Sequence, residues 1–596
     1  MKSFLRYFYL IAALMIVAFS VDGQETQAIA RNVDTVRTDE KEAPAPEPAA
    51  KPLNSTGSLT TRVGVHAAQT FPLSLDEAIR KALASNNDIE VSRDDVRIQE
   101  TAVRSIQGFY DPVFTATPTY NRNSTTGNQA TSDFNVNSNV GGFIRPGGGS
   151  YSVFFNNTRT ENAFSQAQVS NGQVSGGTSA IFLSSTGFRY TQPLMRNFSI
   201  DNTRRNLKIA RRRLEQSDAD FRRTTIETIS RVQNAYWDLV FALRDQQNRQ
   251  ANLDLSRENL RQVEARIAAG ASAPLAKAEV ETELANREAD LLIATQQVSV
   301  AENALKQLLL KDATNAEWTQ PYVPTDRPAF SPDPVNLDIA LKDAMDNRFE
   351  LQRLKLAQDI NKIDIDFFRN QTRPQIDLNT TFSLDGLSQG GASTSAVQFP
   401  QFAGNDDILR QALNDLRPFH NLPLIPNPNV TIPGTPQFLA GGFGRSLRNL
   451  FRSDAPNYSV GVTISFPFRN RTAEANLAGA EITRNQIETQ TRIQEQQVIV
   501  EVRNAVQAVE TARQRVLAAR RARENAQIQL EGERRLFESG RSTSFLLFQR
   551  ENALTNARNA EIRAETDYNK AIANLQRATS TTFERNNITV TSPVSN

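Results

Sequence analysis

The chain repeats its own pattern once, and this duplication constrains the fold more than any other feature of its 596 residues. Pro112 recurs as Pro374, 262 residues later, and each proline follows a helical stretch of about 35 residues. Self-similarity at a fixed distance indicates two copies of one structural unit. We therefore expect repeat 1 over residues 71–330 and repeat 2 over residues 331–585, followed by a short tail at 586–596.

Each repeat contains one very long helix and one returning helix. Residues 203–268 contain no proline or glycine, and residues 472–539 contain only two glycines. A glycine, Gly270 or Gly540, then stops the helix, as is common one residue past a helix end. Returning helices are expected over 274–310 and 544–580. An opening and a returning helix together match one long helix in length, so we expect them to stack end to end beside it.

The second long helix carries a narrow stripe of small apolar residues. They follow a 4-3 spacing that only Arg523 interrupts, at Val498, Val502, Ala505, Val509, Ala512, Val516, Ala519, Ala526 and Leu530. This spacing predicts a coiled-coil seam between closely packed helices. Glu, Arg and Gln fill the other faces, which predicts a helix wetted on much of its surface.

Strands precede both long helices. Residues 186–193 and 458–467 alternate bulky with small or polar residues and end at a proline, a pattern typical of strands. Each is about as long as a tilted barrel strand that crosses a bilayer. With one more strand before each polar insertion, at 121–180 and 387–455, we expect four strands per chain. The second insertion also predicts a short helix over 406–416.

Four strands cannot close a barrel, and an open sheet edge is not tolerated in lipid. Several chains must therefore contribute, and three would supply twelve strands. The chain start is typical of a secretory signal at 1–23, with basic residues before an apolar run. A Pro/Ala-rich tether is expected at 24–70. No later stretch is apolar for long enough to predict a membrane-spanning helix.

Composition excludes several functions. The chain has no cysteine, so disulfides, thiolate metal sites and cysteine nucleophiles are ruled out. It has 67 basic and 65 acidic residues, a balance that predicts no attraction to nucleic acid. The only histidines, His66 and His420, lie in polar, Pro/Gly-containing stretches without a second ligand nearby. No catalytic triad, HExxH motif or catalytic carboxylate pair is present, so we expect no enzyme, metal or cofactor.

Several strings in the expected order resemble a known family. They are Leu73-Ser-Leu-Asp-Glu-Ala-Ile79, Thr191-Gln-Pro-Leu194, Asn234-Ala-Tyr-Trp-Asp-Leu-Val240, the turns at Gly270 and Gly540, and Ile464-Ser-Phe-Pro467. From about 71 to 580 the chain resembles the TolC-type outer-membrane efflux proteins. The resemblance implies a mainly α protein with membrane β structure: a trimeric twelve-stranded β-barrel in the outer membrane, continued by a twelve-helix tube across the periplasm.

The resemblance also implies partners and sites. A periplasmic adaptor protein, linked to an inner-membrane transporter, would dock on the two tip turns, which are Ala269, Gly270, Ala271, Ser272 and Ser539, Gly540, Arg541, Ser542. The pore would be narrowest at Leu546 and Gln549, where family members often carry aspartates. The family's tyrosine and arginine latch falls on Phe537 and Ser542, and its first-repeat aspartate on Ala276, so an ionic latch is not expected here.

Two alternatives remain beside this interpretation. One is a structural coiled-coil protein of the cell envelope without transport activity, although it would not need the strand–proline–helix order of both repeats. The other concerns the basic cluster from Arg204 to Arg213. It is either a solvated face neutralised by nearby acids or a contact with lipid phosphates, the outer-membrane lipid being a further expected partner.

Overall fold

The structure is a computed structural model that describes residues 62, 64–65, 70–124, 126, 130–161, 180–270, 273–390, 394–453 and 455–591. The expected signal at 1–23 lies outside these residues, as does the tether at 24–70 apart from four positions. No helix within the described ranges combines the length and apolarity needed to cross a membrane.

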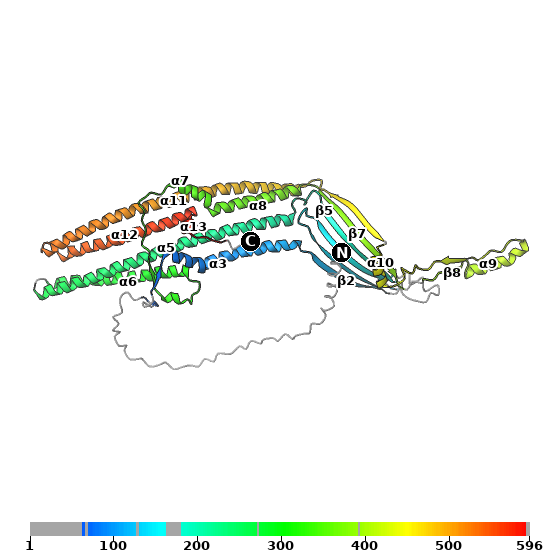
Figure 1. Cartoon of the computed structure of the whole chain (residues 1–596), viewed down its shortest axis with the longest axis horizontal. Coiled ribbons are helices and arrows are strands. Elements are labelled where there is room, and N and C mark those ends of the chain that lie inside the picture. The colour runs from blue at the N-terminus through cyan, green and yellow to red at the C-terminus, as the bar shows by residue number, and fades with distance from the viewer. Residues whose placement is uncertain are drawn as a thin grey trace, which may run out of the picture. The chain divides into compact units, whose positions relative to one another are not determined.

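Both repeats contain the expected elements in the same order (Figure 1). Repeat 1 comprises β1 (Phe71–Leu73), α2 (Leu75–Ser85), α3 (Asn87–Gln107), η1 (Gly108–Tyr110), β2 (Val113–Asn123), β3 (Thr131–Phe143), β4 (Ser150–Glu161), β5 (Ala180–Pro193), α5 (Asn202–Ala268), α6 (Leu275–Leu309), η2 (Ala316–Thr319) and β6 (Tyr322–Pro324). Repeat 2 comprises α7 (Leu337–Asn347), α8 (Phe349–Gln371), β7 (Gln375–Gln389), β8 (Val397–Pro400), α9 (Asn405–Leu416), η3 (Arg417–His420), β9 (Asn429–Ile432), α10 (Phe443–Arg452), β10 (Pro456–Ser465), α11 (Arg471–Glu538), α12 (Ser544–Thr579) and α13 (Thr582–Arg585).

The long and returning helices match the prediction within one or two residues, and α9 confirms the short helix expected in the second insertion. The prediction of a single opening helix was wrong. In both repeats this helix is broken in two, at Asn86 and at Arg348, where the backbone becomes extended. The Asn86 side chain accepts hydrogen bonds from the amides of Asp88 and Ile89 and so caps α3.

The two breaks perform the same task in the two repeats. The Asn86 side chain donates to the carbonyl of Leu308, 2.9 Å away, at the end of α6. Arg348, 262 residues later, donates to the carbonyl of Ala578, 3.1 Å away, at the end of α12. The starts of α3 and α8 therefore meet the ends of α6 and α12, as expected of stacked helices. α2 and α7 form separate short helices that pack beside the same ends of α6 and α12.

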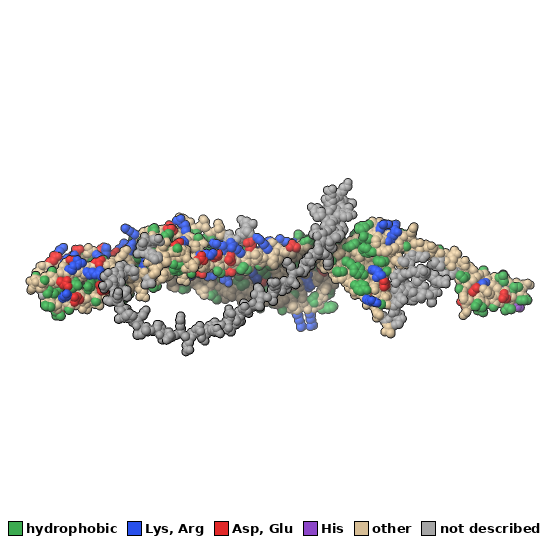
Figure 2. All heavy atoms as spheres, turned by 90° about the horizontal axis from the view of Figure 1, so that it is seen from below, with side chains coloured by type: hydrophobic (Ala, Val, Ile, Leu, Met, Phe, Trp, Pro, Cys, Tyr) green, Lys and Arg blue, Asp and Glu red, His purple; other side chains and the backbone are tan. Residues whose placement is uncertain are grey.

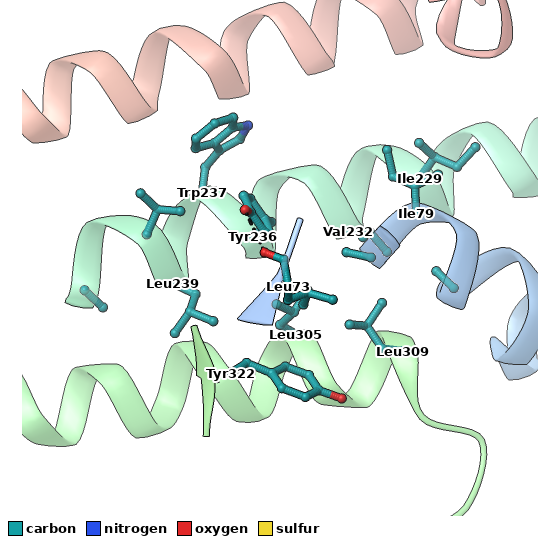
Figure 3. Close-up of a cluster of buried hydrophobic side chains, with 14 of the residues drawn as sticks. Leu73, Ile79, Ile229, Val232, Tyr236, Trp237, Leu239, Leu305, Leu309 and Tyr322 are labelled. Atoms are coloured by element: carbon teal, nitrogen blue, oxygen red, sulfur yellow. Dashed lines mark hydrogen bonds between the residues drawn. The ribbon is translucent and has the colours of Figure 1, made fainter. Parts of the chain in front are cut away.

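The largest core cluster lies where these helix ends meet. It joins the parallel pair of β1 and β6 to α2, α5 and α6 (Figure 3). Tyr236 is fully buried there, and its hydroxyl contacts the Leu73 carbonyl at 3.1 Å and the Asp326 carboxylate at 2.8 Å. Burial and the neighbouring carboxylate raise the pKa of the Tyr236 hydroxyl, so the group stays protonated.

A large antiparallel sheet has the strand order β10-β7-β5-β4-β3-β2. The expected count of four strands was therefore wrong, because the described chain contributes six to this sheet. The extra two come from the insertion at 121–180, which is not only a loop: it forms the hairpin of β3 and β4 between β2 and β5. Residues 144–149, which include three glycines, form the turn between β3 and β4.

All four junctions with the helices lie at one end of this sheet. α3 leads into β2 and β5 into α5, while α8 leads into β7 and β10 into α11. We call this the near end. At the opposite, far end, the second insertion forms a β8–β9 ribbon that carries α9, and then α10.

Candidate functional site: the large sheet and the helical tips

The large sheet has two chemically different faces. Directly paired residues of neighbouring strands share a face, and one row crosses all six strands through Phe114, Val140, Val153, Phe188, Phe382 and Tyr458. Every member of this row is at least 39% exposed. Hydrophobic side chains gather over the sheet in Figure 2. We call this side of the sheet the apolar face.

The opposite, polar face carries mostly Thr, Ser and Asn. One row there runs through Thr117, Asn137, Asn156, Ser185 and Asp385. Alternation along each strand thus separates a large exposed apolar surface from a hydrophilic one. In water such a surface is costly, and patches of this size usually mark contact with a membrane or a partner.

The two outer strands of the large sheet have free edges. In the described chain, β2 pairs only with β3 and β10 only with β7. Each therefore presents unpaired backbone amides and carbonyls, which must find partners before the sheet can enter lipid. Because the sheet has six alternating strands, β10 of one copy and β2 of another would meet antiparallel.

At the other end of the helices, the two tip turns have the same geometry. Gly270 has a φ of 74° and Gly540 a φ of 75°. At the second tip, the Gly540 amide donates to the Phe537 carbonyl and the Arg541 amide to the Leu536 carbonyl, at 3.1 and 2.9 Å. These two bonds form a Schellman motif, which satisfies carbonyls that a helix end leaves free. Ala271 and Ser272 lie outside the described residues.

The tips expose apolar side chains to solvent. Leu275, Leu536 and Phe545 are all exposed, and the added Cβ of a residue at Gly270 or Gly540 would contact nothing within 4 Å. Thr543 caps α12 by accepting the Leu546 amide at 3.3 Å. The tips therefore combine a fixed backbone with an open, partly apolar surface.

Two tip contacts were not predicted from the sequence. The guanidinium of Arg266, at the end of α5, lies 4.9 Å from the centre of the Phe537 ring at the end of α11, a cation–π contact between the two hairpins. Ser542 donates to the Glu533 carboxylate and so ties the second turn to α11. Both contacts use positions where the family latch was expected to be lost. The first depends on how close α5 and α11 lie in the fold, whereas the second is local to the end of α11.

The α5–α6 and α11–α12 hairpins meet each other through polar side chains. Asn248 of α5 donates to Asn559 of α12 at 2.7 Å, and Asn559 donates to Asp245 at 2.5 Å. Further along, Thr555 donates to Asn252 at 3.0 Å. Hydrogen bonds of this kind contribute about 0.5–1.5 kcal/mol each and are less costly to exchange with water than an apolar core. We call this set of contacts the polar ladder.

An acidic residue lies at the tip end of the polar ladder. Burial raises the pKa of the Glu551 carboxyl above its ordinary value of 4.5, although Arg534 and Arg287 oppose the shift. Glu551 is only partly exposed, whereas Leu546 and Gln549, five and two residues earlier in α12, are exposed. No other part of the described chain therefore covers Leu546 and Gln549. Glu551, by contrast, is partly covered by neighbouring side chains.

Three of the six basic residues in the cluster at the start of α5 form ion pairs. Arg204 pairs with Asp201 at 2.7 Å, Arg205 with Asp364 at 2.6 Å and Arg212 with Glu215 at 2.6 Å. These pairs favour the neutralised, solvated interpretation over a lipid contact. Within the described ranges, no group of acidic or histidine side chains could hold a metal ion.

Comparison with known proteins gives a consistent picture. Among solved structures, the chain is similar to a membrane protein from Pseudomonas aeruginosa, with 17% identity, a TM-score of 0.54, and 85% of this chain and 92% of that chain covered. For the Campylobacter jejuni CmeC outer membrane channel these values are 13%, 0.53, 87% and 90%. For the open state of the Neisseria gonorrhoeae MtrE outer membrane channel they are 16%, 0.52, 85% and 88%. These likenesses establish the fold, and no curated protein matches the chain.

The family comparison covers both repeats. The model of the outer membrane efflux protein family matches residues 160–309 and, separately, residues 432–581. Each match spans a strand, a long helix, a tip turn and a returning helix. Since the two matches together cover just over half of the chain, it belongs to the outer membrane efflux protein family, whose members are non-enzymatic channel proteins of the outer membrane that extend into the periplasm.

Proposed function

We propose that three copies of this chain close into one channel, through which an adaptor–transporter complex in the periplasm and inner membrane exports its substrates. The observation that carries the proposal is the large sheet, which has an exposed apolar row across every strand and two unpaired edges. A closed barrel of several copies would pair the edges and turn the apolar face to lipid. The polar face would then line the passage.

The strand count changes the size expected for this barrel. The expected twelve-stranded barrel assumed four strands per chain. With six strands per chain, three copies would supply eighteen. Barrels of 16–18 strands leave an aqueous channel, whereas those of about eight are filled by side chains. Four helical rows per chain, namely α5, α11 and the stacked pairs α3–α6 and α8–α12, would give a tube of twelve rows.

We assign adaptor docking to the tip turns and closure of the pore to the residues beside them. Leu275, Leu536 and Phe545 offer the apolar anchors that protein interfaces require at their centres. Leu546 and Gln549 are exposed in the single chain and carry no charge, so closure would rest on apolar contact and local dewetting. The polar ladder would let one hairpin shift against the other when the tips open.

Pairing of the free edges can be tested with cysteines, because the chain has none of its own. Ser459 of β10 and Thr117 of β2 both lie on the polar face. In one chain they are five strand spacings apart, about 24 Å, far beyond the reach of a disulfide. Any bond between Ser459→Cys and Thr117→Cys, or its neighbours Thr115→Cys and Thr119→Cys, must therefore join two chains.

On mild oxidation in membranes, at least one of these pairs should give a covalent ladder that ends at three chains. The matched control combines Thr117→Cys with Val460→Cys, which points to the apolar face and should not crosslink. A ladder that ends at two chains, or no crosslinking in any of the pairs, would contradict the closed trimer. A structural envelope protein would also fail to conduct ions in planar lipid bilayers.

A further inference from the structure

The second insertion returns to the large sheet as one short helix, α10, and covers part of its apolar face. Ser184 of β5 and Gly386 of β7 pair directly. They lie four residues from Phe188 and Phe382 along their strands, so they are on the apolar face, toward the far end of the sheet. Ser446 of α10 donates to the Gly386 carbonyl at 2.8 Å and lies 2.8 Å from the Ser184 hydroxyl. α10 therefore lies on the side of the sheet that faces lipid in the proposed channel.

The attachment of α10 is close and specific. A Cβ on Gly386 would lie 2.2 Å from the Ser446 carbonyl, so only glycine fits beneath the helix. Asn449 donates to the carbonyls of Leu387 and Phe438, both at 2.8 Å. Leu450 is fully buried against the sheet. The helix is thus a fixed part of the sheet surface.

The remaining surface of α10 divides into two stripes. Phe443, Leu447 and Phe451 follow one another at every fourth position and form an apolar stripe, with Phe443 and Phe451 exposed. The other stripe is basic. It consists of Arg445, Arg448 and Arg452. On a helix, this spacing places each set along one side.

Arg445 and Arg448 have no acidic neighbour on α10 itself, because residues 443–452 contain neither Asp nor Glu. In the described part of the chain, no hydrogen bond or ion pair joins Arg445 or Arg448 to an acidic side chain. Arg452 instead lies over the Phe438 ring, 5.3 Å from its centre. Two arginines beside exposed phenylalanines on a membrane-facing surface are what an interfacial helix presents to lipid.

We infer that α10 lies in the outer surface of the membrane, with its apolar stripe among acyl chains and its arginines on phosphate-bearing lipid headgroups. The inference rests on the proposed function, since it takes the apolar face as the lipid side and the far end as the external one. Continuity with the apolar row favours a lipid occupant. The arginine fork matches phosphate geometry, which favours an anionic headgroup.

The depth of α10 can be measured by fluorescence quenching in vesicles of lipids with brominated acyl chains. Phe451→Trp places a probe on the apolar stripe, and Val460→Trp places one on the apolar face of β10, away from α10. The natural Trp237 and Trp318 lie in the helical part and provide the baseline. Both new probes should be quenched.

The pattern of quenching separates the two proposals. Quenching in the Val460→Trp protein without quenching in the Phe451→Trp protein would overturn the inference and leave the channel standing. Loss of quenching in both variants would contradict a membrane-embedded sheet and, with it, the inference. Quenching of the Phe451→Trp probe by brominated chains supports the depth assigned to α10.

Headgroup recognition is tested by comparing brominated phosphatidylglycerol with brominated phosphatidylcholine on the Phe451→Trp protein. The anionic lipid should be preferred, and Arg445→Gln with Arg448→Gln should reduce the preference by up to about thirtyfold at low salt. Arg503→Gln with Arg521→Gln, two exposed arginines of α11, removes the same charge elsewhere and should leave the preference unchanged. An unchanged preference in the α10 variant would refute headgroup binding. Loss of the preference on adding millimolar inorganic phosphate would identify a soluble phosphate site instead.

Discussion

The backbone geometry of the second tip can be tested with one substitution at two glycines of the same region. Gly540 has a left-handed φ of 75°, while Gly532, eight residues earlier, lies inside α11. An added Cβ contacts nothing within 4 Å at either position, so packing does not distinguish them. Only backbone conformation does.

At Gly540, alanine must adopt the left-handed conformation, which costs about 1 kcal/mol or slightly more. At Gly532, alanine stabilises the helix by about 0.5–1 kcal/mol. The two variants should therefore differ by about 1.5–2 kcal/mol, or roughly ten- to thirtyfold in the local opening equilibrium.

Hydrogen–deuterium exchange of the intact protein in detergent measures this opening. Amides around residues 530–545 should exchange faster in Gly540→Ala than in the natural protein, and more slowly in Gly532→Ala. Gly540→Asn is a useful third variant, since asparagine tolerates this conformation better and should fall between glycine and alanine. Slower exchange in both alanine variants would refute the Schellman turn at this tip.

Three further results are expected. Asn559→Ala removes two bonds of the polar ladder and should lower stability by about 1–2 kcal/mol, whereas Asn556→Ala, an exposed neighbour, should change it by less than about 0.5 kcal/mol in thermal unfolding. The folded protein holds the Glu551 proton more tightly than the unfolded chain, so stability should fall as pH rises from 4.5 through the raised pKa, and Glu551→Gln should make this fall smaller in a series of melting temperatures. Trivalent metal ions should not block the natural channel, but Leu546→Asp with Gln549→Asp should create such a block in bilayer recordings, and a natural channel already blocked would mean that another acidic ring lines the constriction.

The sequence predicted the helical part well because its limits are set locally. Long proline-free runs, with no glycine in α5 and only two in α11, define these helices, and Gly270 and Gly540 end them regardless of what packs nearby. The break at Asn86 and Arg348 escaped prediction because it depends on contact with a helix end more than 200 residues away. Local helix propensity contains no information about such a contact.

The strands of the insertion were missed for a different reason. β3 is rich in Asn and Ser, which have low strand propensity, so its sequence resembles a loop. Only Val136 and Val140 give β3 an alternating apolar pattern, and this pattern is weak. The strand is stabilised by its pairing with β2 and β4. The contact of Arg266 with Phe537 likewise requires knowledge of which helices meet.

Conductance of the purified protein in planar lipid bilayers tests the central claim most directly. If three copies close an aqueous channel, the natural protein should insert and produce discrete, reproducible current steps of a single size. The edge variant that crosslinks as a trimer should give the same steps after oxidation, because its bonds join strands that are already paired. A protein that remains a water-soluble monomer and never conducts would contradict both the barrel and the channel.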